Sequence, residues 1–236
     1  MALVFDIETI GQNFDEMDEV SQKNLTRWIG REAAGNDKKY SAMIAEVKDG
    51  LNFSPLTGEI AAIGIYDTEK DIGVVYYQSP DQENRDIFQE NFTFKAMTEE
   101  EMLKKFWVGV CHYKEFVSFN GRGFDVPFLM IRSAVNKIRP SVNLLADRYL
   151  RYSNGGIRHV DLFDQLSFHG IFKRKGNLHL YCKAFGIRSP KAGGISGEDM
   201  TSYFRDKRYI EIAEYNSWDL IATWELYQVW EDYLRF

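Results

Sequence analysis

A short apolar run near the start of the chain leads directly into two carboxylates, Asp6 and Glu8. The run Ala2 to Phe5 has the length and residue types of a buried strand, which predicts a strand that ends at the acids. Because residues i and i+2 of a strand face the same side, both carboxylates should project together. Two carboxylates buried side by side are costly unless a cation compensates them. The pair therefore constrains the fold, since the rest of the chain must leave it in water or build a cation site around it.

The remaining sequence alternates apolar runs of strand length with stretches of helical periodicity. Thr98 stands three residues before Glu101, the spacing of a capping box, so a helix should begin there. The expected strands are residues 1–6, 60–66, 72–77 and 115–119, and the expected helices are residues 99–111, 125–138, 177–185 and most of 201–236. The second and third strands should form a hairpin beside the first. This order predicts an α/β fold, with a mixed central β-sheet flanked by α-helices.

A polar and charged segment, residues 11–50, interrupts this order. Its apolar residues recur at helical spacing, which predicts one or two surface helices inserted after the first strand. Residues 141–157 should hold a possible helix and a loop. The sequence shows no repeat and no linker, so we expect residues 1–236 to form a single domain that carries this polar helical insertion.

The composition places the chain among ordinary globular proteins. Hydrophobic residues make up 44% of the 236 residues and charged residues 27%, which argues against disorder. The apolar start is too short for a secretory signal, and no apolar run is long enough to span a bilayer. Cys111 and Cys182 stand alone, which argues against a disulfide framework or a cysteine metal site. We therefore expect a cytoplasmic protein without a membrane partner.

The charges are unevenly distributed along the chain. Residues 126–191 contain twelve Lys or Arg against three Asp, a net charge of +9, although the whole chain carries −6. Such asymmetry is typical of a basic surface beside an acidic one, which would attract a polyanion. A solvated basic face without a partner explains the same pattern equally well.

Asp125 and Asp219 are candidate partners for the N-terminal pair of carboxylates. Asp125 opens an expected helix, a position that the helix dipole alone also favours for an acid. Asp219 lies in an apolar helix, where it needs a partner or a face in water. Tyr215, four residues earlier, shares its helix face, so its hydroxyl could orient an attacking water, although a half-buried core tyrosine is commoner. Four carboxylates at one place would suit two hard divalent cations, which prefer oxygen ligands.

Three stretches of the chain, taken in order, resemble the motifs of the DEDD exonuclease superfamily. They are residues 5–9 (Phe-Asp-Ile-Glu-Thr), residues 118–125, which end in Phe-Asp, and residues 215–219 (Tyr-Asn-Ser-Trp-Asp). The tyrosine at the start of the third motif resembles the tyrosine branch, since none of the four histidines lies within that motif. The similarity is greatest to stand-alone exonucleases related to the proofreading domain of family B DNA polymerases. Further similar stretches are residues 55–66, 159–164 and 194–197.

This resemblance implies a ribonuclease H-like fold and a two-metal-ion 3′→5′ exonuclease. Such an enzyme is a hydrolase that releases nucleoside 5′-monophosphates from the 3′ end of a nucleic acid. The implied ligands of two Mg²⁺ or Mn²⁺ ions are Asp6, Glu8, Asp125 and Asp219. Asp6 would bridge both ions, Glu8 and Asp219 would hold the ion that activates water, and Asp125 would help to hold the ion beside the leaving 3′ oxygen. Tyr215 would position the nucleophile.

The resemblance also implies contacts with the substrate. Thr9, Asn120 and Phe124 match positions near the terminal nucleotide, and the Phe124 ring could stack on a base or pack in the core. The basic segment 126–191, densest at Lys173-Arg174-Lys175, would follow the phosphate backbone. Single-stranded DNA is the substrate that the relation to the proofreading domain favours, and an exoribonuclease of the same fold is the alternative.

Two other functions stay open at this stage. One is a nucleic-acid-binding module without catalysis, although all four acids and the tyrosine are present. The other is a structural or partner-binding domain, whose interface would use aromatic residues of the C-terminal helix, namely Trp224, Tyr227, Trp230 and Tyr233. Core packing is the more frequent explanation for such a stripe.

Overall fold

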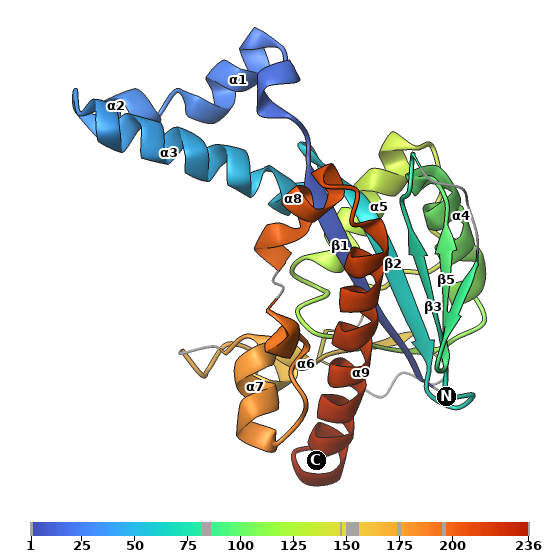
Figure 1. Cartoon of the computed structure of the whole chain (residues 1–236). Coiled ribbons are helices and arrows are strands. Elements are labelled where there is room, and N and C mark those ends of the chain that lie inside the picture. The colour runs from blue at the N-terminus through green and yellow to red at the C-terminus, as the bar shows by residue number, and fades with distance from the viewer. Residues whose placement is uncertain are drawn as a thin grey trace.

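The computed structural model describes residues 2–81, 86–146, 148–149, 156–173, 176–194 and 197–235. These residues form a seven-stranded sheet surrounded by helices (Figure 1). The strands are β1 (Ala2–Gly11), β2 (Gly58–Asp67), β3 (Ile72–Tyr77), β4 (Ile87–Gln89), β5 (Phe92–Ala96), β6 (Glu115–Ser118) and β7 (Arg158–Asp161). The helices are α1 (Glu19–Thr26), α2 (Ile29–Ala33), α3 (Asp37–Asp49), α4 (Glu99–Val110), α5 (Asp125–Val135), α6 (Leu162–Leu166), α7 (Leu178–Phe185), α8 (Met200–Arg205) and α9 (Tyr209–Tyr233).

The sheet is mixed, as the sequence predicted, and its strand order is β4-β5-β3-β2-β1-β6-β7. β1, β2 and β3 form an antiparallel meander, whereas β6 and β7 add in parallel on the far side of β1. The sequence analysis missed β4, β5 and β7. They are short, three to five residues each, so their apolar periodicity is too brief to separate them from loops.

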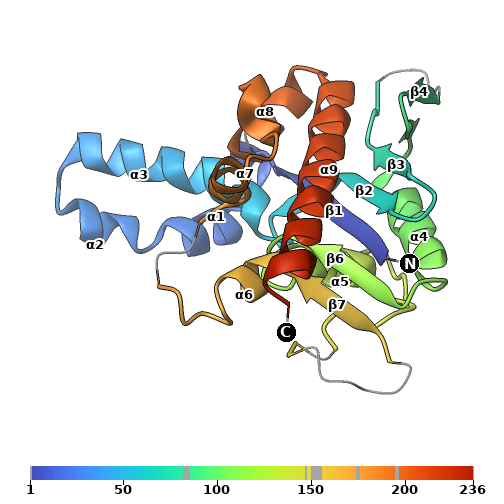
Figure 2. The same ribbon diagram turned by 90° about the horizontal axis from the view of Figure 1, so that it is seen from below.

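Helices cover both faces of this sheet, and the two acids of β1 face only one of them. α9 packs across β1, β2 and β3 on one face, while α4 and α5 pack on the other (Figures 1 and 2). Along β1, Leu3, Phe5 and Ile7 join the apolar cluster on the α4–α5 side. Val4 joins the cluster under α9, so Asp6 and Glu8, which share its parity, also face α9. The alternation of β1 therefore places both acids against one helix.

The observed strand β1 is longer than predicted and does not end at the acids. It continues to Gly11, and its pairing with β2 shifts by one residue between Glu8 and Thr9. The irregularity marks a β-bulge, a feature that redirects side chains in a strand. Asp6 and Glu8 consequently lie within a paired strand, on a more rigid support than a strand end would give.

Helix ends follow local capping chemistry. The capping box of Thr98 and Glu101 is present at the start of α4, and Gly186 ends α7 in a left-handed conformation with φ of 72°. α5 ends at Val135, earlier than the predicted residue 138, because Asn136 caps it. Residues 141–146 form turns in place of the possible helix, and the Asn154-Gly155 turn lies outside the described residues.

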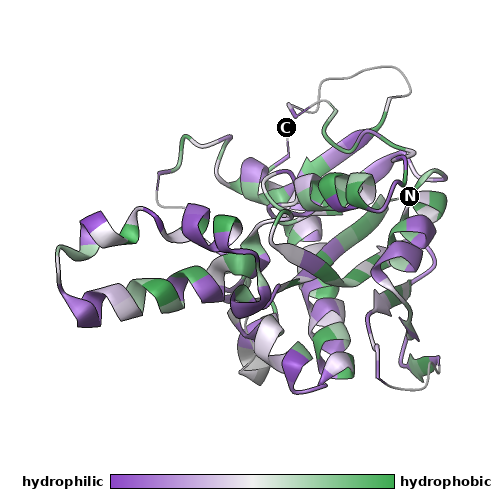
Figure 3. Ribbon diagram, turned by 90° about the horizontal axis from the view of Figure 1, so that it is seen from above, coloured by the Kyte–Doolittle hydropathy of each residue, from purple (hydrophilic) through white to green (hydrophobic). Residues whose placement is uncertain are grey.

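The polar insertion forms three α-helices instead of one or two. α1, α2 and α3 build an arm that projects from the body of the molecule (Figure 2). Hydrophilic and hydrophobic residues alternate along this arm, while apolar residues dominate the strands of the body (Figure 3). A 3₁₀ helix, Gly50–Phe53, returns the chain to β2 and packs against β1.

The C-terminal aromatic residues mostly pack against the body of the protein. Tyr227 and Trp230 are buried, and the Tyr227 ring stacks on Trp224 at 5.4 Å between centroids. Tyr233 is exposed. Core packing therefore accounts for most of the stripe that could have formed a partner interface. Within the described part of the chain, no helix combines the length and apolar character needed to cross a membrane.

Candidate active site

Three carboxylates from distant parts of the chain meet between β1 and α9. One oxygen each of Asp6, Glu8 and Asp219 lies within 4.8 Å of the other two. The pleat of β1 supplies the first two, and the middle of α9 supplies the third. The 4.8 Å separation is short enough for one cation to contact all three residues, because carboxylate oxygens bind hard cations at about 2.0–2.6 Å.

Asp125 stands beside this trio, at the first residue of α5. Its Oδ1 accepts the backbone N–H of Ile7 at 3.1 Å, which ties it to β1 between Asp6 and Glu8. Asp125 is 3% exposed. The structure thus brings all four predicted acids to one place, with Asp125 held by the backbone of the strand that carries two of the others.

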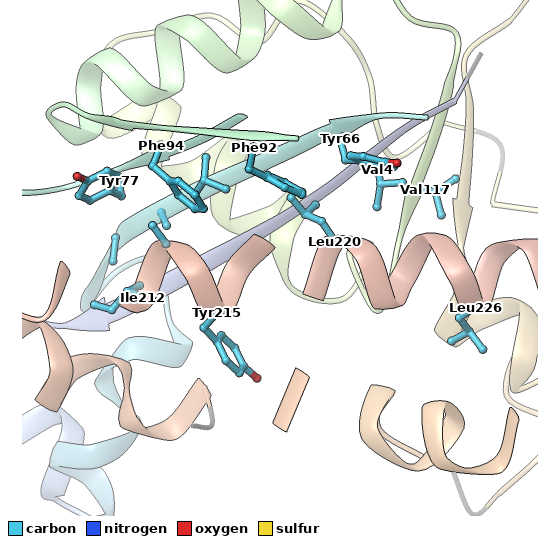
Figure 4. Packing of buried hydrophobic residues seen from close by; sticks show 14 of the residues in the cluster. Val4, Tyr66, Tyr77, Phe92, Phe94, Val117, Ile212, Tyr215, Leu220 and Leu226 are labelled. Carbon is cyan, nitrogen blue, oxygen red and sulfur yellow. The ribbon is translucent and has the colours of Figure 1, made fainter. Parts of the chain in front are cut away.

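Tyr215 lies one turn before Asp219 on α9, close enough that its hydroxyl lowers the pKa of the Asp219 carboxylate against the larger effect of burial. The ring points away from the sheet (Figure 4). Burial, together with the neighbouring carboxylates, raises the pKa of Tyr215 far above its usual value. The hydroxyl therefore stays neutral and acts as a hydrogen-bond donor near neutral pH.

Asn216 connects α9 to the first acid of β1. Its Nδ2 donates to Asp6 Oδ2 at 2.8 Å. Gly64 lies opposite Asp6 in the β1–β2 pairing, and a Cβ at Gly64 would stand 1.9 Å from Asn216 Oδ1. The missing side chain of Gly64 thus leaves the space in which the Asn216 amide reaches Asp6. Asn216 is fully buried, and its Oδ1 accepts no hydrogen bond from the described residues.

The loop before Asp125, residues 119–124, is held by Asp161 at the end of β7. Asp161 Oδ1 accepts the N–H of Asn120 at 2.8 Å, and its Oδ2 accepts the N–H of Arg122 at 2.9 Å. Asn120 has a φ of 64°, in the left-handed region that costs a non-glycine residue energy. The buried carboxylate of Asp161 therefore stabilises a strained turn that leads into α5.

Burial raises the pKa of all four carboxyl groups, and neighbouring carboxylates add to the effect at Asp6, Glu8 and Asp125. Burial raises the pKa of Asp6 and Glu8 well above their usual values, and the neighbouring carboxylates raise both further. Burial also raises the pKa of Asp125 to about 7 and that of Asp219 to about 7. Hydrogen bonds, such as the one from Asn216 to Asp6, act in the opposite direction without cancelling the effect. The cluster therefore favours protonation, or the binding of positive charge.

A cavity of about 420 Å³ opens beside the carboxylates. Asp219, Tyr215 and Asn120 line it together with Lys191, whose charge lowers the pKa of Asp219. The remaining lining residues are Phe119, Phe163, Gly176, Asn177, Leu178, His179 and Pro190. This cavity combines aromatic rings, an amide and a cation beside the acids.

The three predicted substrate contacts lie in different surroundings. Asn120 lines the cavity. Thr9 is buried, and its hydroxyl donates to the carbonyl oxygen of Asn52 at 2.8 Å, so its side chain anchors the segment that returns from the arm. Phe124 is half-buried, with its ring 5.5 Å from that of Phe128 and 6.4 Å from that of the exposed Phe53. The Phe124 ring thus packs against Phe128 while part of it stays accessible to solvent.

The basic segment is only partly available to a ligand. Arg132 is buried and forms a salt bridge with Glu99 at 2.7 Å, and Arg148 pairs with Asp164 at 2.6 Å. Lys191 and Arg188 instead line cavities. Of the cluster at 173–175, Arg174 and Lys175 lie outside the described residues. The expectation that the whole segment follows a phosphate backbone is therefore wrong for Arg132.

Two residues that position the site, Gly64 and Asn216, were not predicted from the sequence. A glycine inside an apolar strand often marks a close approach of another element, and this signal was present at Gly64. Asn216 carried no comparable signal, because an amide beside a motif tyrosine is common in helices. Asp161 was noted only within a similar stretch, without a role.

The ligand atoms of the cluster suit hard divalent cations. All four side chains offer carboxylate oxygens, the preference of Mg²⁺, Mn²⁺ and Ca²⁺. A cation would also relieve the repulsion that raises the pKa of Asp6 and Glu8. The residues therefore fit divalent metal binding.

The fold is shared with a much larger protein. The family B DNA polymerase from the hyperthermophilic archaeon Pyrobaculum calidifontis matches 98% of this chain with a TM-score of 0.58 and 16% sequence identity. The chain spans about a quarter of that polymerase, since the match covers 24% of it. The architecture is therefore α/β and ribonuclease H-like, as predicted. No curated protein sequence matches the chain.

A family assignment follows from the sequence. Residues 69–233 match the family described as "Predicted 3'-5' exonuclease related to the exonuclease domain of PolB", and the chain belongs to this family. The predicted relationship to DEDD exonucleases is thereby confirmed. The matched residues include Asp125, Tyr215 and Asp219, whereas Asp6 and Glu8 precede them. Exonuclease domains of this kind use divalent metals.

Proposed function

We propose that this protein is a 3′→5′ exonuclease that hydrolyses the terminal phosphodiester bond of single-stranded DNA and releases nucleoside 5′-monophosphates. The observation that carries this proposal is the meeting of Asp6, Glu8 and Asp219 within 4.8 Å, with Asp125 tied to the same strand. Such a cluster is costly in a protein that only packs or binds, because the carboxylates repel one another.

Asp6, Glu8, Asp125 and Asp219 would hold two divalent cations, Mg²⁺ or Mn²⁺. When bound, these cations supply positive charge for the phosphate oxygens and acidify the attacking water. Asp6 is suited to serve both cations, since its carboxylate lies among the other three. Asn216 holds one oxygen of Asp6 and thereby limits its rotation.

The remaining residues would orient the reactants. Tyr215 is a neutral donor beside Asp219, placed to hydrogen-bond the attacking water and aim it at the phosphorus atom. Lys191 and Asn120 line the same cavity and could hold a phosphate oxygen and the terminal nucleotide. Phe124 would lie beside the terminal base, and Thr9 would support the site indirectly, because its hydroxyl anchors the segment at Asn52. Residues 1–236 would act as one exonuclease domain.

A direct test uses a 5′-labelled single-stranded DNA oligonucleotide with Mg²⁺, with Mn²⁺ and with a chelator. We expect a ladder that shortens from the 3′ end, only with metal and only with the wild-type protein. The Asp6→Ala variant should bind the oligonucleotide without shortening it. A matching RNA oligonucleotide distinguishes the exoribonuclease alternative, and the lack of any ladder on both would favour a non-catalytic binding module.

A further inference from the structure

A second cavity lies next to the active-site cavity, on the neighbouring face of α9. Its volume is about 570 Å³, and it is lined by α9, by the β4–β5 hairpin and by the segment around Pro190. Pro190 lines both cavities. Trp218 contributes to the second cavity, while the next residue, Asp219, contributes to the first. The two cavities are therefore adjacent, and nothing in the proposed chemistry uses the second.

The second cavity has an aromatic and apolar floor. Phe92 and Phe94 project from the sheet toward α9 (Figure 4), and Trp218 and Ile221 line the cavity from the helix. Trp218 is 38% exposed, although it lies beside a buried cluster of acids. A ring left open at a cavity wall provides a flat surface for stacking, which every nucleobase can use.

The second cavity is also lined by one cation, on the segment that leads to the shared Pro190. Arg188 lines it, two residues before Pro190, and the described residues give Arg188 no ion pair. Lys191 follows on the other side of Pro190 and lines the first cavity. Each cavity is thus lined by one cation, and each cation could bind one phosphate of a strand.

The wall between the cavities is firmly built. Ser189 and Pro190 are buried, and the Ser189 hydroxyl is 2.6 Å from Nδ1 of His179, which lines the first cavity. Two carboxylates, Glu90 and Glu225, also line the second cavity. They would repel a run of phosphates, so the cavity suits one base with its single phosphate at the Arg188 end.

We propose that this second cavity binds a nucleotide of the substrate strand next to the pair joined by the scissile phosphate. Arg188 would bind its phosphate and Trp218 would stack on its base. The inference rests on the proposed exonuclease function, and it identifies the substrate as a strand that occupies both cavities at once. It predicts a preference for strands of at least three nucleotides.

The test compares substrates of different length with variants of the second cavity. The substrates are thymidine 5′-monophosphate p-nitrophenyl ester, dithymidylate and hexathymidylate, each with Mn²⁺. For Arg188→Ala and Trp218→Ala, we expect the KM for the hexanucleotide to rise roughly 5- to 100-fold, the range for loss of one stacked base, and the KM for the dinucleotide to change far less. Trp218→Phe keeps a ring and should restore most of the affinity even if Trp218→Ala folds poorly.

The controls separate this inference from the proposed function. Arg205, an exposed arginine that lines a different cavity, provides the matched variant Arg205→Ala, which should behave as wild type on every substrate. Equal KM changes on the dinucleotide and the hexanucleotide, or none on either, would overturn the second subsite while leaving the exonuclease intact. Hydrolysis of no substrate by the wild type would overturn the function itself.

A further experiment tests whether the second cavity binds a nucleotide of the strand or the free product. Free thymidine 5′-monophosphate, the expected product, carries the same base and phosphate as a strand nucleotide. If Arg188→Ala weakens competitive inhibition by the free nucleotide as much as it raises the KM for the hexanucleotide, the cavity holds product instead of strand, and the proposal is overturned. Weak inhibition that the substitution leaves unaltered supports the strand.

Discussion

Two buried acidic sites lie on opposite sides of the same sheet, and they differ in how far other residues balance their negative charge. On the α4–α5 face, Glu99 accepts hydrogen bonds from Arg132 at 2.7 and 2.9 Å, from Asn136 at 3.1 Å and from the backbone N–H of Ile60 at 2.8 Å. Where β1 meets α9, the described residues give the four carboxylates little more than the Asn216 amide, the backbone N–H of Ile7 and the nearby charge of Lys191 to balance them. The carboxylate of Glu99 is neutralised by a partner within the protein, whereas the four acids have too few partners to balance their charge.

This difference separates a structural role from a functional one. A buried ion pair is satisfied by its own partners and needs nothing from solution. A carboxylate cluster without an internal cation is unstable when ionised, so it gains from a ligand that carries positive charge. Arg132 pairs with Glu99, whereas among the described residues Asp6 has the Asn216 amide and no ion pair. The α9 site is therefore built to take its charge from outside.

The largest expected effect is on activity at the α9 site. Asp6→Asn should lower kcat/KM on a single-stranded oligonucleotide by at least about 10³-fold, because it removes a proposed metal ligand. The same variant should unfold at an equal or higher temperature than the wild type in the presence of a chelator, since one repelling charge is gone. A variant that keeps its activity would break the functional half of the comparison.

The opposite result is expected on the α4–α5 face. Glu99→Gln should lower the free energy of unfolding by about 3–5 kcal/mol, the cost of leaving Arg132 buried without its partner. Urea denaturation with and without metal measures this change. The folded fraction should retain near wild-type activity per folded molecule, and a loss of turnover without a loss of stability would contradict the structural role of Glu99.

A smaller effect is expected where the fold supports the acid cluster. Gly64→Ala should displace Asn216, because the new Cβ would overlap its Oδ1, and Asp6 should lose its hydrogen bond. Loss of such a supporting partner typically costs about 10–100-fold in metal affinity or activity. Asn216→Ala should give a similar decrease in Mn²⁺ affinity by titration calorimetry. Gly109→Ala is the matched control, since nothing lies within 4 Å of its added Cβ. Unaltered Mn²⁺ affinity in Gly64→Ala would remove the role assigned to this contact.

The smallest effect is a dependence of stability on pH. The raised pKa values of Asp125 and Asp219, both about 7, mean that the folded protein binds more protons than the unfolded chain between pH 4 and 7. In a chelator, the contribution of these two groups to stability should be complete below about pH 4 and should be lost progressively as pH rises to 7. Each kcal/mol lost lowers the Tm by about 2–4 °C. Mn²⁺ should reverse the decrease at pH 7.5 in the wild type and not in Asp6→Asn.

Local patterns in the sequence predicted much of the fold and which candidate site residues share a face of their strand or helix. The parity of β1 requires Asp6 and Glu8 to face the same side, and helical spacing requires Tyr215 and Asp219 to share a face. The capping box at Thr98 and the glycine after α7 define helix ends through contacts within a few residues. These features depend on neighbours in the chain, so they can be read before the chain is folded.

Contacts between distant segments could not be predicted from local patterns. The position of Asn216 over Gly64, the burial of Arg132 beside Glu99 and the stabilisation of the Asn120 turn by Asp161 each join residues 33 to 152 positions apart. Their partners depend on which faces pack together, and no local periodicity encodes that. The sequence therefore specified which acids could bind cations, while the packing of α9 on the sheet decided which charges stay unpaired, because only close packing removes water and selects neighbours.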